Sequence, residues 1–236
     1  MKKTLLIAAA ALAAAITSSQ AQVYSANVVG YANIVTPASV NTLLAVPFKI
    51  GVSNGANEVF TALPEFSQVL IWNINTSSYT LYQTDTGSPT GWSDAGSSPV
   101  PAPLLPVGQG FFLNPAANTT NTFAGTVAVN VGTSNVLTLA NASVNYLVGD
   151  FVPYAGSVTN GTSSGGGANL NNLPEFSQVL IWNANTSSYT LYQTDTGSPS
   201  GWSDAGSSPV APPTLTVGQG LFISPAAANA KWITGL

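Results

Sequence analysis

Two pairs of aspartates are the side chains of this chain best suited to chemistry. Asp85 and Asp94 lie nine residues apart, and Asp195 and Asp204 repeat that spacing. Paired carboxylates can cleave glycosides as acid and base, and their oxygens also suit Ca²⁺. The sequence, however, contains no His, Cys or Arg to assist catalysis, and the spacing differs from that of an EF-hand loop. Because Asp and Gly also form ordinary turns, we predict no catalytic, metal or cofactor site and no enzyme, with calcium at Asp85 and Asp94 left as an open alternative.

Aromatic residues near these aspartates favour a different kind of site. Trp92 and Trp202 each lie in a Gly-rich segment, and an exposed indole beside polar groups is suited to bind a sugar. The candidate ligand-binding residues, one set per repeat, are Trp92, Asp94 and Tyr82, and Trp202, Asp204 and Tyr192. The alternative is that Trp92 turns inward and closes one end of a β-sandwich, since tryptophan is highly buried on average.

These residues belong to a stretch that occurs twice. Residues 63–118 and 173–228 are 56 residues long, and 46 positions agree at an offset of 110. In the first copy, the apolar run over residues 68–72 predicts a buried strand. A second strand should pair back on it across a turn rich in Asn and Ser. Because the strands of the two copies are identical, we expect Trp72 and Trp182 each to be buried within its own unit.

The whole chain is predicted to be rich in strands. Residues 28–35 are β-branched and aromatic, and turn signals recur at the spacing typical of sandwiches and barrels. Residues 123–131 and 135–140 look like a hairpin. We therefore predict an all-β fold of two tandem, pseudo-symmetric repeats of about 100 residues, each β-sandwich or barrel-like. The first should cover residues 22–121 and the second residues 122–236, and the sequence leaves open whether they share one core.

Charged residues are unusually scarce. Asp, Glu, Lys and Arg make up 5% of the sequence, against roughly 25% in an average soluble domain. The chain is nevertheless 45% apolar, so we do not expect disorder. Its net charge of −4 argues against nucleic acid as a partner, because binding nucleic acid needs a basic surface. The absence of Cys excludes disulfides and thiol chemistry.

The first residues are typical of a secretory signal peptide. Lys2 and Lys3 precede an apolar run over residues 5–16 and a small polar segment that ends at Ala21. We therefore expect residues 1–21 to be removed and the protein to be secreted, either to the periplasm or to the cell surface and exterior. The apolar run is too short to span a bilayer and no later run is long enough, so no transmembrane segment is predicted.

Short motifs along the chain resemble those of a known family. They are VYS at 23–25, NVVGY at 27–31, WN at 72–73, GW at 91–92, GQGFF at 108–112, FAG at 123–125, GQG at 218–220 and Trp232. On these motifs the chain resembles a family of secreted two-repeat β proteins of unknown function, typical of Verrucomicrobia-type bacteria. The resemblance covers essentially the whole chain after residue 21 and implies a β architecture, but no chemistry, since the family has none established. The two repeats are more alike here than is usual in that family.

Together these features favour a structural or interaction protein of the cell surface or extracellular matrix. Edge strands without Lys can add to strands of another chain, so self-assembly into fibres is predicted, with residues 23–35 as the candidate donated strand. The alternative for this segment is pairing within its own unit. The alternative function is a carbohydrate-binding module with one aromatic site per repeat and a polysaccharide as partner.

Overall fold

The computed structural model describes residues 29–130, 132–159 and 167–235. The predicted signal peptide, residues 1–21, and the start of the candidate donated strand, residues 23–28, lie outside these ranges. Within them the chain forms eighteen strands and one short helix, α2 (Ala56–Val59). The prediction of an all-β fold is confirmed. No helix in the described ranges is long and apolar enough to cross a membrane.

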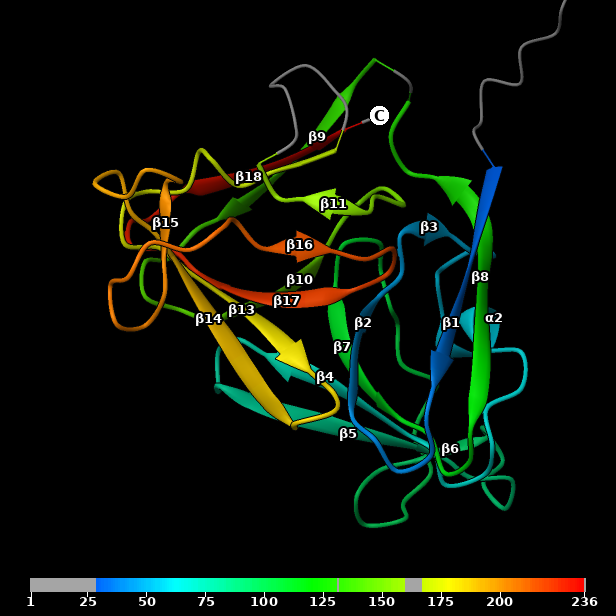
Figure 1. The fold of residues 1–236 in the computed structure, drawn as a ribbon. Helices are drawn as coiled ribbons and strands as arrows, with labels where there is room; N and C mark the ends of the chain where they lie inside the picture. Colours follow the sequence, from blue (N-terminus) through cyan, green and yellow to red (C-terminus); the bar gives the residue numbers. More distant parts are fainter. Residues whose placement is uncertain (1–28, 131, 160–166, 236) are drawn as a thin grey trace, which may run out of the picture.

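The first unit contains a five-stranded and a three-stranded antiparallel sheet (Figure 1). The larger sheet has the spatial order β2 (Thr42–Ala45), β7 (Gly110–Asn114), β4 (Gln68–Asn73), β5 (Ser78–Thr84) and β6 (Trp92–Ser93). The smaller sheet has the order β1 (Val29–Thr36), β8 (Thr119–Val127) and β3 (Phe48–Lys49). Phe111 from the larger sheet and Phe48 and Phe123 from the smaller one meet in one buried core.

The second unit repeats this arrangement. Its larger sheet has the order β10 (Tyr146–Gly149), β17 (Gly220–Ser224), β13 (Gln178–Asn183), β14 (Ser188–Thr194) and β15 (Trp202–Ser203). Its smaller sheet has the order β9 (Ser134–Leu139), β18 (Ala230–Gly235) and β12 (Gly167–Asn169), and a two-stranded sheet joins β11 (Gly156–Ser157) to β16 (Thr214–Leu215). Leu139, Leu221 and Trp232 lie in a separate core. The predicted pair of pseudo-symmetric sandwich-like repeats is therefore present.

The β4–β5 hairpin forms where the sequence predicts it. The two strands pair antiparallel, with Asn73 opposite Ser78 at the turn. The Asn73 Oδ1 atom accepts a hydrogen bond of 3.0 Å from the main-chain N–H of Asn75, which is the local bond that suits asparagine to turns. β13 and β14 form the same hairpin, with Asn183 opposite Ser188.

The hairpin predicted for residues 123–131 and 135–140 is wrong. β8 pairs with β1 and β3, whereas β9 pairs with β18. The two strands thus belong to different units, and β8 crosses the boundary expected between residues 121 and 122. The physical reason is packing, because Phe123 of β8 is buried in the first core and Leu139 of β9 in the second.

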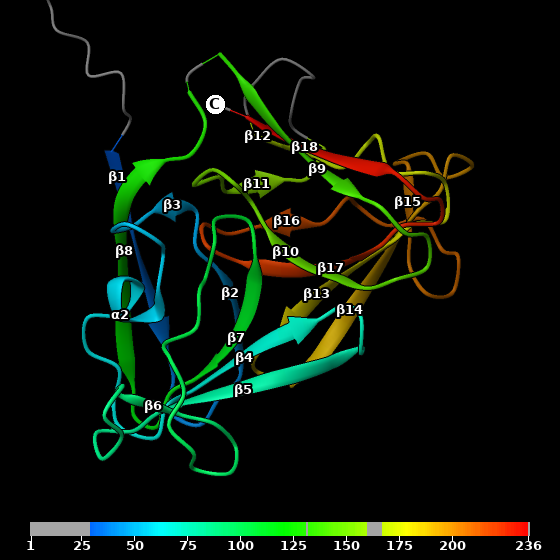
Figure 2. The ribbon, with the colours of Figure 1, turned by 180° about the vertical axis from the view of Figure 1, so that it is seen from behind.

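The two larger sheets lie next to each other (Figures 1 and 2). They meet at a third apolar cluster, which we call the seam. It consists of four buried and four half-buried residues: Leu43, Phe112, Leu147 and Phe222, with Leu70, Trp72, Leu180 and Trp182. Side chains alternate between the faces of a strand, so Val69 of β4 turns to its own core while Trp72 turns to the other unit. The expectation that Trp72 and Trp182 are buried within their own units is therefore wrong.

Candidate functional site

The two tryptophans predicted as sugar platforms lie inside the protein. Trp92 is 2% exposed and Trp202 is 1% exposed. Trp92 lies opposite Thr84, where β6 pairs with the end of β5, and its indole N–H donates a hydrogen bond of 2.6 Å to Asn57 Oδ1 of α2. A stacking platform needs an exposed ring face, so neither indole provides one. The structure agrees with the alternative, in which the ring turns inward.

The aspartates of the predicted sites hold their own loops together. One carboxylate oxygen of Asp94 accepts hydrogen bonds from the main-chain N–H groups of Gly96, at 2.8 Å, and Ser98, at 2.9 Å. Asp204 makes the same pair of bonds in the second unit, to Gly206 and Ser208. These carboxylates therefore close turns, which is a common structural role of Asp.

The two tyrosines of the predicted sugar sites also pack against the cores. Tyr82 is half-buried against the first core and Tyr192 against the second. The structure thus brings Tyr82 and Trp92 to one core, with Asp94 outside in a loop. The six candidate residues do not form an open saccharide surface.

A shallow pocket nevertheless lies beside each buried tryptophan. The first has a volume of about 220 Å³ and is lined by Glu65, Asp85 and Trp92, among others. The second, of about 130 Å³, is lined by the equivalent Glu175 and Asp195. The carboxylate that joins Asp85 in this pocket is thus Glu65 rather than Asp94.

The carboxylates of these pockets already accept hydrogen bonds, and they are too few to form a metal site. The Thr86 hydroxyl donates to Glu65 Oε1 at 2.7 Å, and Thr196 donates to Glu175 in the same way. Asp85 accepts a hydrogen bond of 2.9 Å from the N–H of Gly87 in its own loop. Among the residues that the structure describes, no group of three or more His, Cys, Asp or Glu side chains could hold a metal ion.

A buried carboxyl group that the sequence analysis did not single out lies in the second unit. Asp150 is 6% exposed, and its Oδ1 accepts a hydrogen bond of 3.1 Å from the N–H of Val152. Burial raises the pKa of Asp150 to about 7, although main-chain N–H groups act in the opposite direction. A comparison of the two repeats could have found it, because Asp150 follows β10 where the fully buried Val46 follows β2.

An edge strand with exposed apolar side chains, β1, lies in the first unit. This strand ends the smaller sheet of the first unit and, among the described residues, pairs on one side only, with β8. Val29, Tyr31 and Val35 point away from the core and are 73%, 74% and 68% exposed. The sequence predicted the strand but not this apolar stripe, because both faces of β1 carry apolar or small residues and neither is clearly polar.

The second unit has a matching edge. β9 ends its smaller sheet, and Val136 on this strand is 45% exposed. The two lysines of the described residues lie elsewhere, Lys49 on β3 and Lys231 on the central strand β18. Neither β1 nor β9 therefore carries the lysine that commonly protects a sheet edge from pairing with another chain.

Comparison with known proteins adds no function to this picture. No protein-family model, curated protein or solved structure matches the chain.

Proposed function

We propose that the protein is a secreted, non-enzymatic interaction protein of the bacterial exterior, which assembles with further copies of itself through the free edge of β1. The observation that carries this proposal is an eight-residue edge strand with three exposed apolar side chains. Export is supported by the signal-like pattern of residues 1–21 in the sequence.

Sheet extension suits this edge for two physical reasons. The free side of β1 presents main-chain N–H and C=O groups that a neighbouring strand can pair with. Val29, Tyr31 and Val35 stand beside that edge, so an added strand can cover part of their apolar surface. Charge repulsion between copies is weak, because only 5% of the residues are charged.

The position of the edges determines the kind of assembly. β1 pairs with β8 in its own chain, so it serves as an acceptor of another strand rather than as a donated strand. The matching edge β9 lies on the other unit. Pairing of β1 with β9 of the next copy is head-to-tail, and such contacts build an open filament unless they happen to close into a ring.

Analytical ultracentrifugation of the chain from Gln22 tests the proposal. We expect the wild type to form species larger than a monomer, in proportions that rise with protein concentration. Replacing Tyr31 and Val35 together by Lys puts charges on the edge strand and should yield a monomer. Val136→Lys on β9 should also shorten the assemblies.

The matched control is Val52→Lys, because Val52 is 99% exposed but lies in the loop after β3. This variant should assemble as the wild type does. A wild type that sediments as a folded monomer at every concentration would contradict the proposal, and so would equal assembly of the Tyr31 and Val35 variant.

A further inference from the structure

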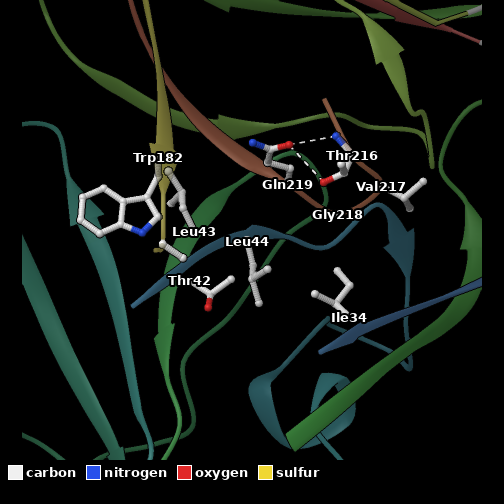
Figure 3. A pocket seen from close by; sticks show the side chains of 10 residues that line it. Ile34, Thr42, Leu43, Leu44, Trp182, Thr216, Val217, Gly218 and Gln219 are labelled. Atoms are coloured by element: carbon white, nitrogen blue, oxygen red, sulfur yellow. Dashed lines mark hydrogen bonds between the residues drawn. The ribbon is translucent and has the colours of Figure 1, made fainter. Parts of the chain in front are cut away.

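A groove lies where the first unit meets the turn before β17 of the second. Its volume is about 290 Å³. Residues of β1 and β2 form one wall. The other wall consists of the end of β13, the turn between β13 and β14, and the turn before β17 (Figure 3). Its lining includes Ile34, Thr42, Trp182, Ala184, Thr216 and Gln219.

The groove is formed by residues that differ between the repeats. Only ten positions distinguish the two 56-residue copies, and two of them, Ala184 and Thr216, line the groove. A third difference lies outside these copies. Thr42 on β2 and Tyr146 on β10 occupy equivalent positions, because each pairs with the equivalent residue of its sheet. In the other repeat, a larger or stiffer residue stands at each of these positions: Ile74 in place of Ala184, Pro106 in place of Thr216, and Tyr146 in place of Thr42.

The two repeats also differ in the side chain that lies next to an equivalent glycine. Gly218 lines the groove, and a side chain placed there would meet the end of Ile34. At the equivalent Gly108, a side chain would meet the ring of Phe151 instead. An aliphatic side chain thus stands beside the turn on the groove side, and an aromatic ring stands beside it on the other. The duplication has therefore produced two unequal sides.

The polar groups of the groove are held in fixed positions. Gln219 Oε1 accepts hydrogen bonds from the main-chain N–H of Thr216, at 2.9 Å, and from its hydroxyl, at 3.1 Å. This fixes the amide so that its nitrogen lies on the side of Trp182 (Figure 3). The indole is fixed as well, since its N–H donates to the carbonyl of Asn41 at 2.7 Å. An amide donor and a half-buried indole therefore flank the same groove.

The lining also favours neutral ligands over charged ones. None of the residues around the groove is Asp, Glu, Lys or Arg, so an ion entering it would lose hydration without a partner of opposite charge. A neutral ring compound with an apolar face and a hydrogen-bonding rim fits better. The apolar face can lie against the apolar side chains that line the groove, and the rim can accept from the Gln219 amide.

From this geometry we infer that the groove binds one ring of a neutral sugar, either free or at the end of a polysaccharide. The site is single, lies between the units, and does not involve Trp92 or Trp202. The groove uses the other face of β1 from the exposed apolar stripe, because Val29, Tyr31 and Val35 point away from the core whereas Ile34 points toward the groove.

Equilibrium dialysis tests this inference, because it measures binding to monomers and assemblies alike. The probes are radiolabelled methyl glucoside, methyl galactoside, N-acetylglucosamine and a glucose disaccharide. At least one should bind saturably, with a dissociation constant on the order of 1 mM for so few contacts. Tighter binding of the disaccharide than of methyl glucoside would identify a polysaccharide end as the ligand, and equal binding would identify a single ring.

The repeats supply variants with matched controls. Ala184→Ile installs the residue found at position 74 and should weaken binding at least about tenfold, whereas Ile74→Ala should leave it unchanged. Gln219→Leu should also weaken binding, with Gln109→Leu as its control in the identical GQG motif. This second pair decides the question if Ala184→Ile does not fold. Absence of saturable binding by all four probes, or wild-type binding by both groove variants, would overturn the inference.

Discussion

The indole N–H of Trp182 donates a hydrogen bond of 2.7 Å to the main-chain carbonyl of Asn41, in the other unit. Trp72 makes the reciprocal bond, at 2.8 Å, to Asn145. Each indole also meets a phenylalanine of the opposite unit edge to face, as in the pair of Trp182 and Phe112 with ring centroids 5.2 Å apart. The seam is thus held by two equivalent anchors, each carrying both a hydrogen bond and an aromatic contact.

Replacing both Trp72 and Trp182 by Leu should uncouple the two units. Each change removes a hydrogen bond worth about 0.5–1.5 kcal/mol and an edge-to-face aromatic contact worth a similar amount, while the two cores remain. We expect the wild type to unfold in one calorimetric transition and the double variant in two. A single transition at the wild-type midpoint would show that the anchors do not couple the units.

Trp92→Ala should destabilise the first unit by about 3–5 kcal/mol, the usual cost of truncating a large core aromatic. The reason is that Trp92 is 2% exposed and packs in the first core. Denaturant titration measures this cost. Val52→Ala, at a position that is 99% exposed, is the control and should change stability little. A loss below about 1 kcal/mol for Trp92→Ala would mean that the indole is not part of the core.

The features predicted well from the sequence were those encoded locally. The β4–β5 hairpin follows from an apolar run and an Asn-rich turn within a few residues, and Asn73 closes that turn as its type suggests. The repeated architecture follows from the near-identity of residues 63–118 and 173–228. In both cases the information lies in contiguous residues, so no knowledge of distant contacts is needed.

The features predicted poorly depend on contacts between distant segments. β8 follows β7 in the sequence but pairs with β1, more than eighty residues away, as in Val29 opposite Thr126. Trp72 lies in a strand that is apolar on both faces, so periodicity could not show which face meets the other unit. The candidate sugar site failed for the same reason, since the sequence places Trp92 and Asp94 close together without showing that one side chain points inward.

Glu58→Gln should loosen the loop after β3 and make its stability less sensitive to acid. The Glu58 carboxylate accepts hydrogen bonds from the main-chain N–H groups of Val52, Ser53 and Gly55, at 2.9–3.0 Å. These bonds lower the pKa of Glu58 to about 2. A lowered pKa means that the stabilising contribution is complete above the ordinary value of 4.5 and is lost as the pH falls toward 2.

Hydrogen exchange of the Val52 and Ser53 amides between pH 5 and pH 2 checks this prediction, with exchange rates corrected for their intrinsic pH dependence. Protection should fall with pH in the wild type and should be low throughout in Glu58→Gln. The control is Glu65→Gln, whose carboxylate bonds to the Thr86 hydroxyl and not to this loop. Equal protection in the wild type and Glu58→Gln would contradict the proposed role.

The buried Asp150 should make the second unit less stable as the pH rises. Its Oδ2 atom and the Thr234 hydroxyl are both buried, and neither has a hydrogen bond within ordinary distance and angle among the described residues, although the nearby hydroxyl still acts to lower the pKa of Asp150. Burial raises the pKa of Asp150 from 3.8 to about 7, so the folded state holds the proton more tightly than the unfolded chain does. The contribution to stability is therefore complete below pH 3.8 and is lost progressively up to about pH 7, by at most about 4 kcal/mol.

Denaturant titration of the wild type and two variants, between pH 4 and pH 8, tests this dependence. Asp150→Asn cannot ionise, so its stability should vary less with pH than that of the wild type. Asp150→Val copies the buried Val46 of the first unit and should exceed the wild type in stability near pH 8, where the wild type carries an unpaired buried charge. If the difference between the wild type and Asp150→Asn is the same at pH 4 and pH 8, the carboxyl group does not titrate in this range and the prediction is wrong.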